Sequence, residues 1–358
     1  ARAIECPPAF LACARRQRRC LGRFAFLQRL EQARVMTTIA VSNDVLTDMV
    51  WIPGGTFRMG SDEHYPEEAP AQPASVDGFW MDRCPVTNRD FEAFVQATGH
   101  RTVAEVAPGP AQYPGGKREL MNPGSLVFKK PGGPVDMRDF TNWWKYILGA
   151  DWRHPRGPNS TIRGRADHPV VHVAYADAEA YARWKGKSLP TEAEWEFAAR
   201  GGLDGAEYAW GNELMPEGRP MANFWQGEFP WQNLRTDGYE GTSPVASFPA
   251  NGYELFDMAG NVWEWTTDWY TSRQAHGKTS PCCIPSNPRG GPMEDSYDPR
   301  QPRIRIPRKV IKGGSHLCAP NYCRRYRPAA RFPEPIDTST CHLGFRCIIR
   351  PSRPLSDR

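Results

Sequence analysis

Several features common in other protein classes are missing from this sequence of 358 residues. No stretch approaches the roughly 18 consecutive apolar residues of a membrane-spanning helix, so we expect no transmembrane segment. No CxxC pair is present, which weakens the case for structural zinc. An excess of one charge is also missing from most of the chain. Residues 1–35 hold eight of the 45 Lys and Arg and two of the 40 Asp and Glu, which leaves 37 basic and 38 acidic groups. We therefore expect no basic nucleic-acid-binding surface on the main domain.

The first 35 residues do not have the pattern of a signal peptide. Their short apolar stretch, residues 7–14, comes before the arginine cluster, whereas a signal peptide carries its charge first. We expect residues 1–48 to be a disordered arm or an over-extended reading frame, with Met36 or Met49 as the natural start. A basic interaction tail is the alternative. Residues 351–358 are expected to be a tail, and deletion of residues 1–35 should leave activity intact.

The composition predicts a loop-rich protein. Gly and Pro number 32 and 35, close to a fifth of the chain against a usual share of roughly 12%. Thirteen Trp, 16 Phe and 12 Tyr argue against disorder. We predict one large α+β domain over residues 49–350, with little regular secondary structure and with loops packed by aromatic side chains.

Local patterns predict a few elements inside this domain. Strands are expected at residues 50–52, 56–59 and 79–81. Thr87 should begin a helix that Gly99 ends, and a second helix should cover residues 176–184. Thr191 and Glu194 form a capping box for a third helix, which Gly201 ends. Residues 103–165 have no clear period and are expected to be loops with short elements.

The cysteines carry the main chemical signal. Seven of the ten follow residue 35, and an odd number argues against a complete disulfide framework. Cys318 and Cys323 are close together, and Arg324, Arg325 and Arg327 would favour the thiolate form. Two thiolates could hold Cu(I), but a disulfide fits the spacing equally well, and zinc with His316 and His342 is a weaker alternative.

The segment around this pair, Gly-Gly-Ser-x-x-Cys-x4-Cys-x-Arg-Tyr-Arg, resembles the active-site signature of the formylglycine-generating enzymes, copper-dependent oxidases that mature sulfatases. Other blocks resemble the same family in the same order, over about residues 49–350. They are Gly54–Ser61, Pro85–Asn88, Trp152–Pro155, His168–Val173, Leu189–Glu196, Trp225–Gly227, Gly260–Trp265 and Gly344–Cys347.

The resemblance implies an enzyme that uses O2 and a reductant to convert a cysteine of a sulfatase Cys-x-Pro-x-Arg motif into Cα-formylglycine. It implies that Cys318 and Cys323 bind copper, with the unfolded sulfatase polypeptide as substrate. Catalytic roles are also implied for Ser315, Trp263 and Tyr322, although Trp263 is equally suited to the core and Ser315 to a turn.

The resemblance also implies two structural calcium ions, which prefer oxygen ligands. The first site would use the side chains of Asn223 and Asp237 and the carbonyls of Phe224 and Tyr239. The second would use the side chains of Asp257 and Glu264 and the carbonyls of Gly260 and Val262.

Some residues depart from the family pattern. Cys347 matches one half-cystine of the animal secretory members, but Ala182 and Pro328 stand where others would be, so those bridges cannot form; this indicates a bacterial-type enzyme in a reducing cytoplasm. We also expect a monomer. No role is assigned to Cys84 or to the Cys282–Cys283 pair. Two alternatives are a non-catalytic peptide-binding relative and a sulfoxide synthase of thiol-histidine biosynthesis. The second would need a HxxxHxE pattern, which the chain lacks.

Overall fold

The computed structural model describes residues 46–109, 113, 118–273 and 284–351. Thr47–Arg350 forms one unit. Residues 1–45 of the predicted arm, the Cys282–Cys283 pair and residues 352–358 of the predicted tail lie outside the described residues. Within the part that is described, no helix has both the length and the apolar character that a bilayer-spanning segment needs.

Two sheets form the centre of the unit. One has three strands in the order β1-β4-β11, and the other has four in the order β10-β7-β8-β9, with only β10 and β7 parallel. Two further strand pairs, β2-β3 and β5-β6, are antiparallel ribbons. The strands are β1 Met49–Ile52, β2 Gly55–Met59, β3 Gln72–Val76, β4 Phe79–Asp82, β5 Gly124–Phe128, β6 Trp144–Leu148, β7 Trp263–Trp269, β8 Arg308–Lys312, β9 Phe332–Pro335, β10 Leu343–Gly344 and β11 Ile348–Ile349.

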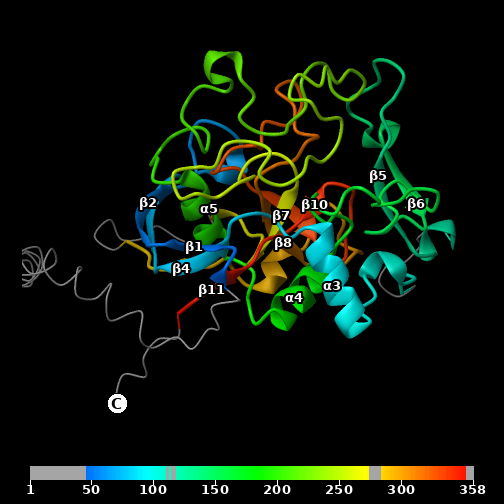
Figure 1. Ribbon diagram of the computed structural model, residues 1–358, viewed down its shortest axis with the longest axis horizontal. Coiled ribbons are helices and arrows are strands. Elements are labelled where there is room, and N and C mark those ends of the chain that lie inside the picture. Colours follow the sequence, from blue (N-terminus) through cyan, green and yellow to red (C-terminus); the bar gives the residue numbers. More distant parts are fainter. Residues whose placement is uncertain (1–45, 110–112, 114–117, 274–283, 352–358) are drawn as a thin grey trace, which may run out of the picture. The chain divides into compact units, whose positions relative to one another are not determined.

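Three α-helices are described: α3 Asn88–Thr98, α4 Tyr175–Trp184 and α5 Glu192–Arg200. Thr87 and Thr191 cap the first and third through capping boxes, and Gly99 and Gly201 end them in the left-handed conformation, as predicted. Figure 1 shows β7 and β8 at the centre, with β1, β4 and α5 on one side and β5 and β6 at the opposite edge.

The predicted fold class is confirmed: the unit is a mixed α and β structure with few helices and long loops. The three predicted strands are present, but the two that flank Pro53–Gly55 do not pair with each other, because β1 pairs with β4 and β2 with β3. Residues 103–165 contain the β5-β6 ribbon and short 3-10 helices at Val103–Glu105, Arg118–Met121 and Phe140–Asn142.

Candidate active site

The two predicted cysteines lie side by side without a disulfide. Their Sγ atoms are 3.2 Å apart, and both side chains are free thiols. Cys318 is buried, with 2% of its surface exposed, whereas Cys323 is only partly covered. Of the two arrangements that the spacing allowed, the structure therefore has the open dithiol.

Local backbone structure brings the sulfurs together. β8 ends at Lys312, and Gly313 and Gly314 then take positive φ angles of 92° and 69°. A Cβ on Gly314 would lie 2.8 Å from backbone atoms of Arg325, so this glycine allows the two cysteine-bearing segments to touch. The amide of Cys323 donates to the carbonyl of Ala319 at 2.9 Å, which turns the chain back toward Cys318.

The two sulfur atoms differ in their preferred charge. The Cys318 thiol donates to Cys323 and, with the cation of Arg325 nearby, lowers the pKa of Cys323 to about 6. Burial raises the pKa of Cys318 well above its usual value. The pair is therefore best described as a buried thiol that donates to a partly exposed thiolate, and thiolates are the form that binds soft metals.

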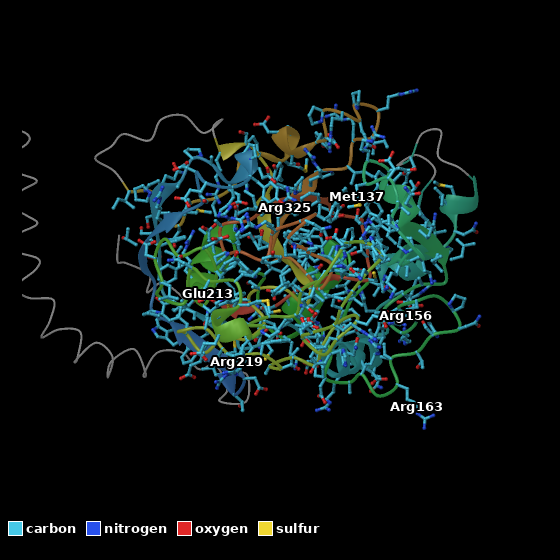
Figure 2. All side chains as sticks on the ribbon, turned by 90° about the horizontal axis from the view of Figure 1, so that it is seen from above. Met137, Arg156, Arg163, Glu213, Arg219 and Arg325 are labelled. Atoms are coloured by element: carbon cyan, nitrogen blue, oxygen red, sulfur yellow. The ribbon has the colours of Figure 1, made fainter. Side chains whose placement is uncertain are left out.

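Arg325 is the cation that accompanies this thiolate. Its Nη1 atom lies 3.7 Å from Cys323 Sγ, and its Nη2 atom donates to Glu67 in the 3-10 helix Pro66–Glu68. The guanidinium also lies over the ring of Tyr65, 3.8 Å from its centroid. Arg325 is labelled in Figure 2, where it lies among densely packed side chains. The guanidinium is thus fixed from two sides.

A pocket of about 310 Å³ opens at the sulfur pair, and we call it the active-site pocket. All five residues predicted to act in catalysis line it: Ser315, Cys318, Cys323, Trp263 and Tyr322. Ser315 and Trp263 are buried, and Ser315 Oγ accepts a hydrogen bond from the amide of Leu317 at 3.2 Å. Tyr322 is 42% exposed and stacks on Phe229 with ring centroids 4.3 Å apart. These expected residues therefore share one cavity.

Other residues of the active-site pocket were not predicted as site residues. Phe229 forms a wall through its stack with Tyr322, and it follows soon after the Trp225–Gly227 block in the sequence. Glu334 on β9 also lines the pocket, and burial raises the pKa of this carboxyl to about 8, with Asp337 adding to the shift. Glu334 belongs to no recognisable sequence motif. Its position in the pocket follows only from the way β9 packs near the cysteines.

The oxygens proposed for the first calcium site come close together. The amide nitrogen of Gln226 donates both to the carbonyl of Phe224 and to Asp237 Oδ2, the latter at 3.0 Å. Burial raises the pKa of Asp237, a half-buried carboxylate that forms no ion pair with the residues the structure describes. Two of the four predicted ligands thus converge on one point, which Gln226 occupies.

The second predicted calcium site joins the first through its backbone. The amide of Asn261 donates to the carbonyl of Asn223 at 2.8 Å, so the two predicted ligand segments touch. Glu264 accepts bonds from Arg346 at 2.8 Å on both carboxylate oxygens and from Trp195 at 2.7 Å. The Glu264 carboxylate therefore already has strong hydrogen-bond partners. At Asp257, the other carboxylate predicted for this site, burial raises the pKa.

No group of three or more His, Cys, Asp and Glu side chains suited to a metal occurs among the described residues. The ring nitrogens Nδ1 of His316 and His342 are instead 2.8 Å from the Asn261 carbonyl and 2.6 Å from Thr340 Oγ1. The structure therefore offers the zinc alternative no support within the part of the chain that it describes.

Arg327, at the end of the signature, and Arg331, four residues after it, both meet acids in the interior. Arg327 Nη1 donates to Glu68 at 2.8 Å, and Arg331 Nη2 to Glu192 at 2.9 Å. Both guanidinium groups are buried. These two pairs connect the cysteine segment to the start of α5 and to the loop that holds Glu67.

The chain is similar to known proteins over most of its length. A family model for the sulfatase-modifying factor enzyme 1-like domain matches residues 36–351. The formylglycine-generating enzyme of Mycobacterium tuberculosis is 52% identical over 308 residues, which cover 86% of this chain and 99% of that protein. Inactive C-alpha-formylglycine-generating enzyme 2 of Bos taurus is 36% identical over 320 residues, 88% of this chain and 92% of its own.

A solved structure of lower sequence identity has a similar fold. The structure of PvdO from Pseudomonas aeruginosa has a TM-score of 0.57 at 23% identity and covers 85% of this chain and 94% of its own. This likeness concerns the fold alone. With a family model over residues 36–351 and 52% identity to a relative matched along nearly its whole length, the chain belongs to the family of formylglycine-generating enzymes.

Proposed function

We propose that this protein oxidises a cysteine of a sulfatase Cys-x-Pro-x-Arg motif to Cα-formylglycine. The observation that carries the proposal is the open pair of sulfurs, 3.2 Å apart, at the active-site pocket. The reaction balances when one O2 and two electrons from a reductant turn the CH2–SH group into an aldehyde, with release of hydrogen sulfide and water. A pocket beside two thiols suits a substrate whose reacting atom is also sulfur.

The residues of this chain would supply binding and order. Phe229 and Tyr322 form a stacked aromatic wall against which an extended peptide can lie. Ser315 supports the turn that holds Cys318 by accepting the Leu317 amide, and Arg325 neutralises the charge on Cys323. Because these contacts exist before any substrate arrives, the sulfur pair is preorganised.

We propose Cu(I) as the metal that Cys318 and Cys323 hold. Two free, adjacent thiols, one of them favoured as thiolate, fit this soft ion. When bound, copper would supply the reactivity toward O2 that no amino-acid side chain has. The chain would provide only two sulfur ligands, so a substrate sulfur could complete the set.

We also propose two calcium ions, at Asn223, Phe224, Asp237 and Tyr239 and at Asp257, Gly260, Val262 and Glu264. The support is the convergence of the Phe224 and Asp237 oxygens and the burial of the Asp237 and Asp257 carboxylates, which raises the pKa of both although hydrogen bonds to each oppose the shift. The free thiols among the described cysteines agree with a further proposal, that of a monomeric bacterial enzyme in a reducing cytoplasm.

Similarity to an inactive relative means that activity must be tested at the site itself. Purified protein loaded with copper is mixed with O2, a reductant and a Cys-x-Pro-x-Arg peptide, and the aldehyde is detected by mass and by hydrazide capture. We expect aldehyde from the wild type and none from Cys318→Ser or Cys323→Ser. A Cys84→Ser variant, outside the active-site pocket, is the matched control. No aldehyde from the wild type would leave the non-catalytic binding protein as the better reading.

A further inference from the structure

A second cavity, of about 450 Å³, lies beside the active-site pocket, and Leu317 lines both. Its walls come from the end of β5, from residues 155–165 and from residues 240–242. The proposed reaction uses none of the charged residues that line it. We call it the second cavity.

Positive charge dominates the second cavity. Lys129, Lys130, Arg156 and Arg165 line it, together with one acid, Glu240. Lys130 Nζ lies 3.4 Å from Glu240 Oε1, so this lysine is compensated. The other three cations have no acidic partner within the described part of the chain. Three uncompensated positive charges therefore surround one hollow.

Arg165 shows that this clustering of positive charge is energetically unfavourable. Its side chain is partly buried, and burial together with repulsion from Arg156 lowers the pKa of its guanidinium. A guanidinium that loses water without gaining a counter-ion is unfavourable, and an anion between the two arginines would reverse the effect. Arg163, two residues away, is fully exposed and does not line the cavity. Figure 2 shows Arg163 extending outward from the molecule.

We propose that the second cavity binds an oxyanion between Arg156 and Arg165. The planar donors of arginine match the paired oxygens of a carboxylate, sulfate or phosphate. The rest of the lining mixes apolar side chains such as Val127 and Val171 with hydroxyl groups such as that of Thr242, which can donate further hydrogen bonds to an oxyanion. The oxyanion is either a free ion or a carboxylate of the polypeptide substrate, because the two cavities are neighbours.

The first experiment measures binding of inorganic sulfate by calorimetry at low ionic strength. The wild type should bind one sulfate saturably, Arg165→Gln should weaken binding at least tenfold, and the control Arg163→Gln should leave it unchanged. Lys129→Gln serves as a second cavity variant with an exposed side chain, should Arg165→Gln not fold. Equal weakening by Arg163→Gln and Arg165→Gln would show general charge attraction only and overturn the proposal.

A second arm identifies the source of the oxyanion. Two amidated Cys-x-Pro-x-Arg peptides, one with a flanking Glu and one with Gln there, are compared for affinity to wild type and Arg165→Gln. If sulfate does not bind but the Glu peptide binds the wild type several-fold more tightly, the substrate supplies the carboxylate. If sulfate does not bind and the peptides do not differ, the second cavity has no oxyanion site. Neither arm requires turnover, so failure here is separate from failure of the proposed reaction.

Discussion

The charged side chains around the active-site pocket differ in whether they have an oppositely charged partner. Arg325 has Glu67 on one side and the Cys323 sulfur on the other. Glu334, on the opposite strand β9, lines the same pocket but has no ion pair within the described residues. An unmatched carboxyl in such a place makes the stability of the protein depend on pH.

Glu334 should therefore destabilise the fold as pH rises. Burial raises the pKa of Glu334 from 4.5 to about 8, so the folded state holds a proton between these pH values that the unfolded state has released. The contribution of Glu334 to stability is fully present below pH 4.5 and falls with increasing pH until the carboxyl has titrated in the folded state as well. Glu334→Gln should gain several degrees in Tm relative to wild type at pH 8 and nothing at pH 4.5. Equal Tm differences at both pH values would contradict this assignment.

Gly314 is the residue on which contact between the two cysteine segments depends. Gly314→Ala combines a positive φ with a Cβ 2.8 Å from the Arg325 backbone, so we expect a loss of about 3 kcal/mol or more and loss of peptide oxidation. Gly205→Ala is the control, since its φ is 77° but no heavy atom lies within 4 Å of the added Cβ. Urea unfolding compares the two variants, and similar losses would mean that the close approach is unimportant.

The sequence predicts the two cysteines and Ser315 better than it predicts the residues that surround them. Cys318, Cys323 and Ser315 follow from one local block, because only four residues separate the two cysteines. Glu334 and Phe229 could not be predicted, since their place depends on how β9 and the segment after Trp225 fold against that block.

Helix α5 connects distant parts of the unit through charge. Glu196 accepts Lys312 of β8 at 3.0 Å, Arg200 at 2.8 Å and the amide of Gly60 at 2.7 Å. Burial would raise the pKa of Glu196, but Lys312, Arg200 and Arg273 outweigh it and lower the pKa far below its usual value. A sheet strand, a helix and the loop after β2 are thus held at one carboxylate.

Removal of this carboxylate should cost far more than removal of a surface one. Glu196→Gln removes the carboxylate that pairs directly with the buried Lys312 and Arg200, and we expect a loss of roughly 3–5 kcal/mol. Glu179→Gln breaks the exposed pair with Arg183 on α4 and should change stability by less than about 1 kcal/mol. Chemical denaturation measures both, and a small loss for Glu196→Gln would mean that the network contributes little.

Elements whose ends are set by local residues were predictable. Thr87, Gly99, Thr191 and Gly201 cap or end their helices through contacts within a few residues. The pairing of β4 with β1 and β11 was not predicted, because no local pattern specifies a strand's partner, least of all β11, which lies more than 200 residues away. The same holds for the four-stranded sheet that carries β8 to the site.

At the scale of the whole molecule, long loops need support that their few regular hydrogen bonds do not give. The two predicted calcium segments meet at Asn223 and Asn261 and are packed against the turn that follows β8, since the amide of Gly260 donates to the carbonyl of Gly313 at 2.9 Å. Ions bound there would stabilise the loops and the cysteine segment together.

Removal of calcium should therefore lower the melting temperature of the entire unit. A ligand that binds only the folded state raises stability, so addition of EGTA should reduce Tm by several degrees and added calcium should restore it. Magnesium should restore it poorly, because it demands a tighter six-coordinate geometry. Asp237→Ala should respond less than wild type. If EGTA leaves the wild-type Tm unchanged, the protein has no structural calcium.

The pairing of β4 with β11 also constrains when the protein becomes an enzyme. Residues 79–82 leave the ribosome early, yet their partner strand is residues 348–349, translated after both cysteines. The three-stranded sheet cannot close until then. The thiols at 318 and 323 are thus synthesised before the strand that completes this sheet, so a chain cut short before residue 348 would carry both thiols without the completed framework around them.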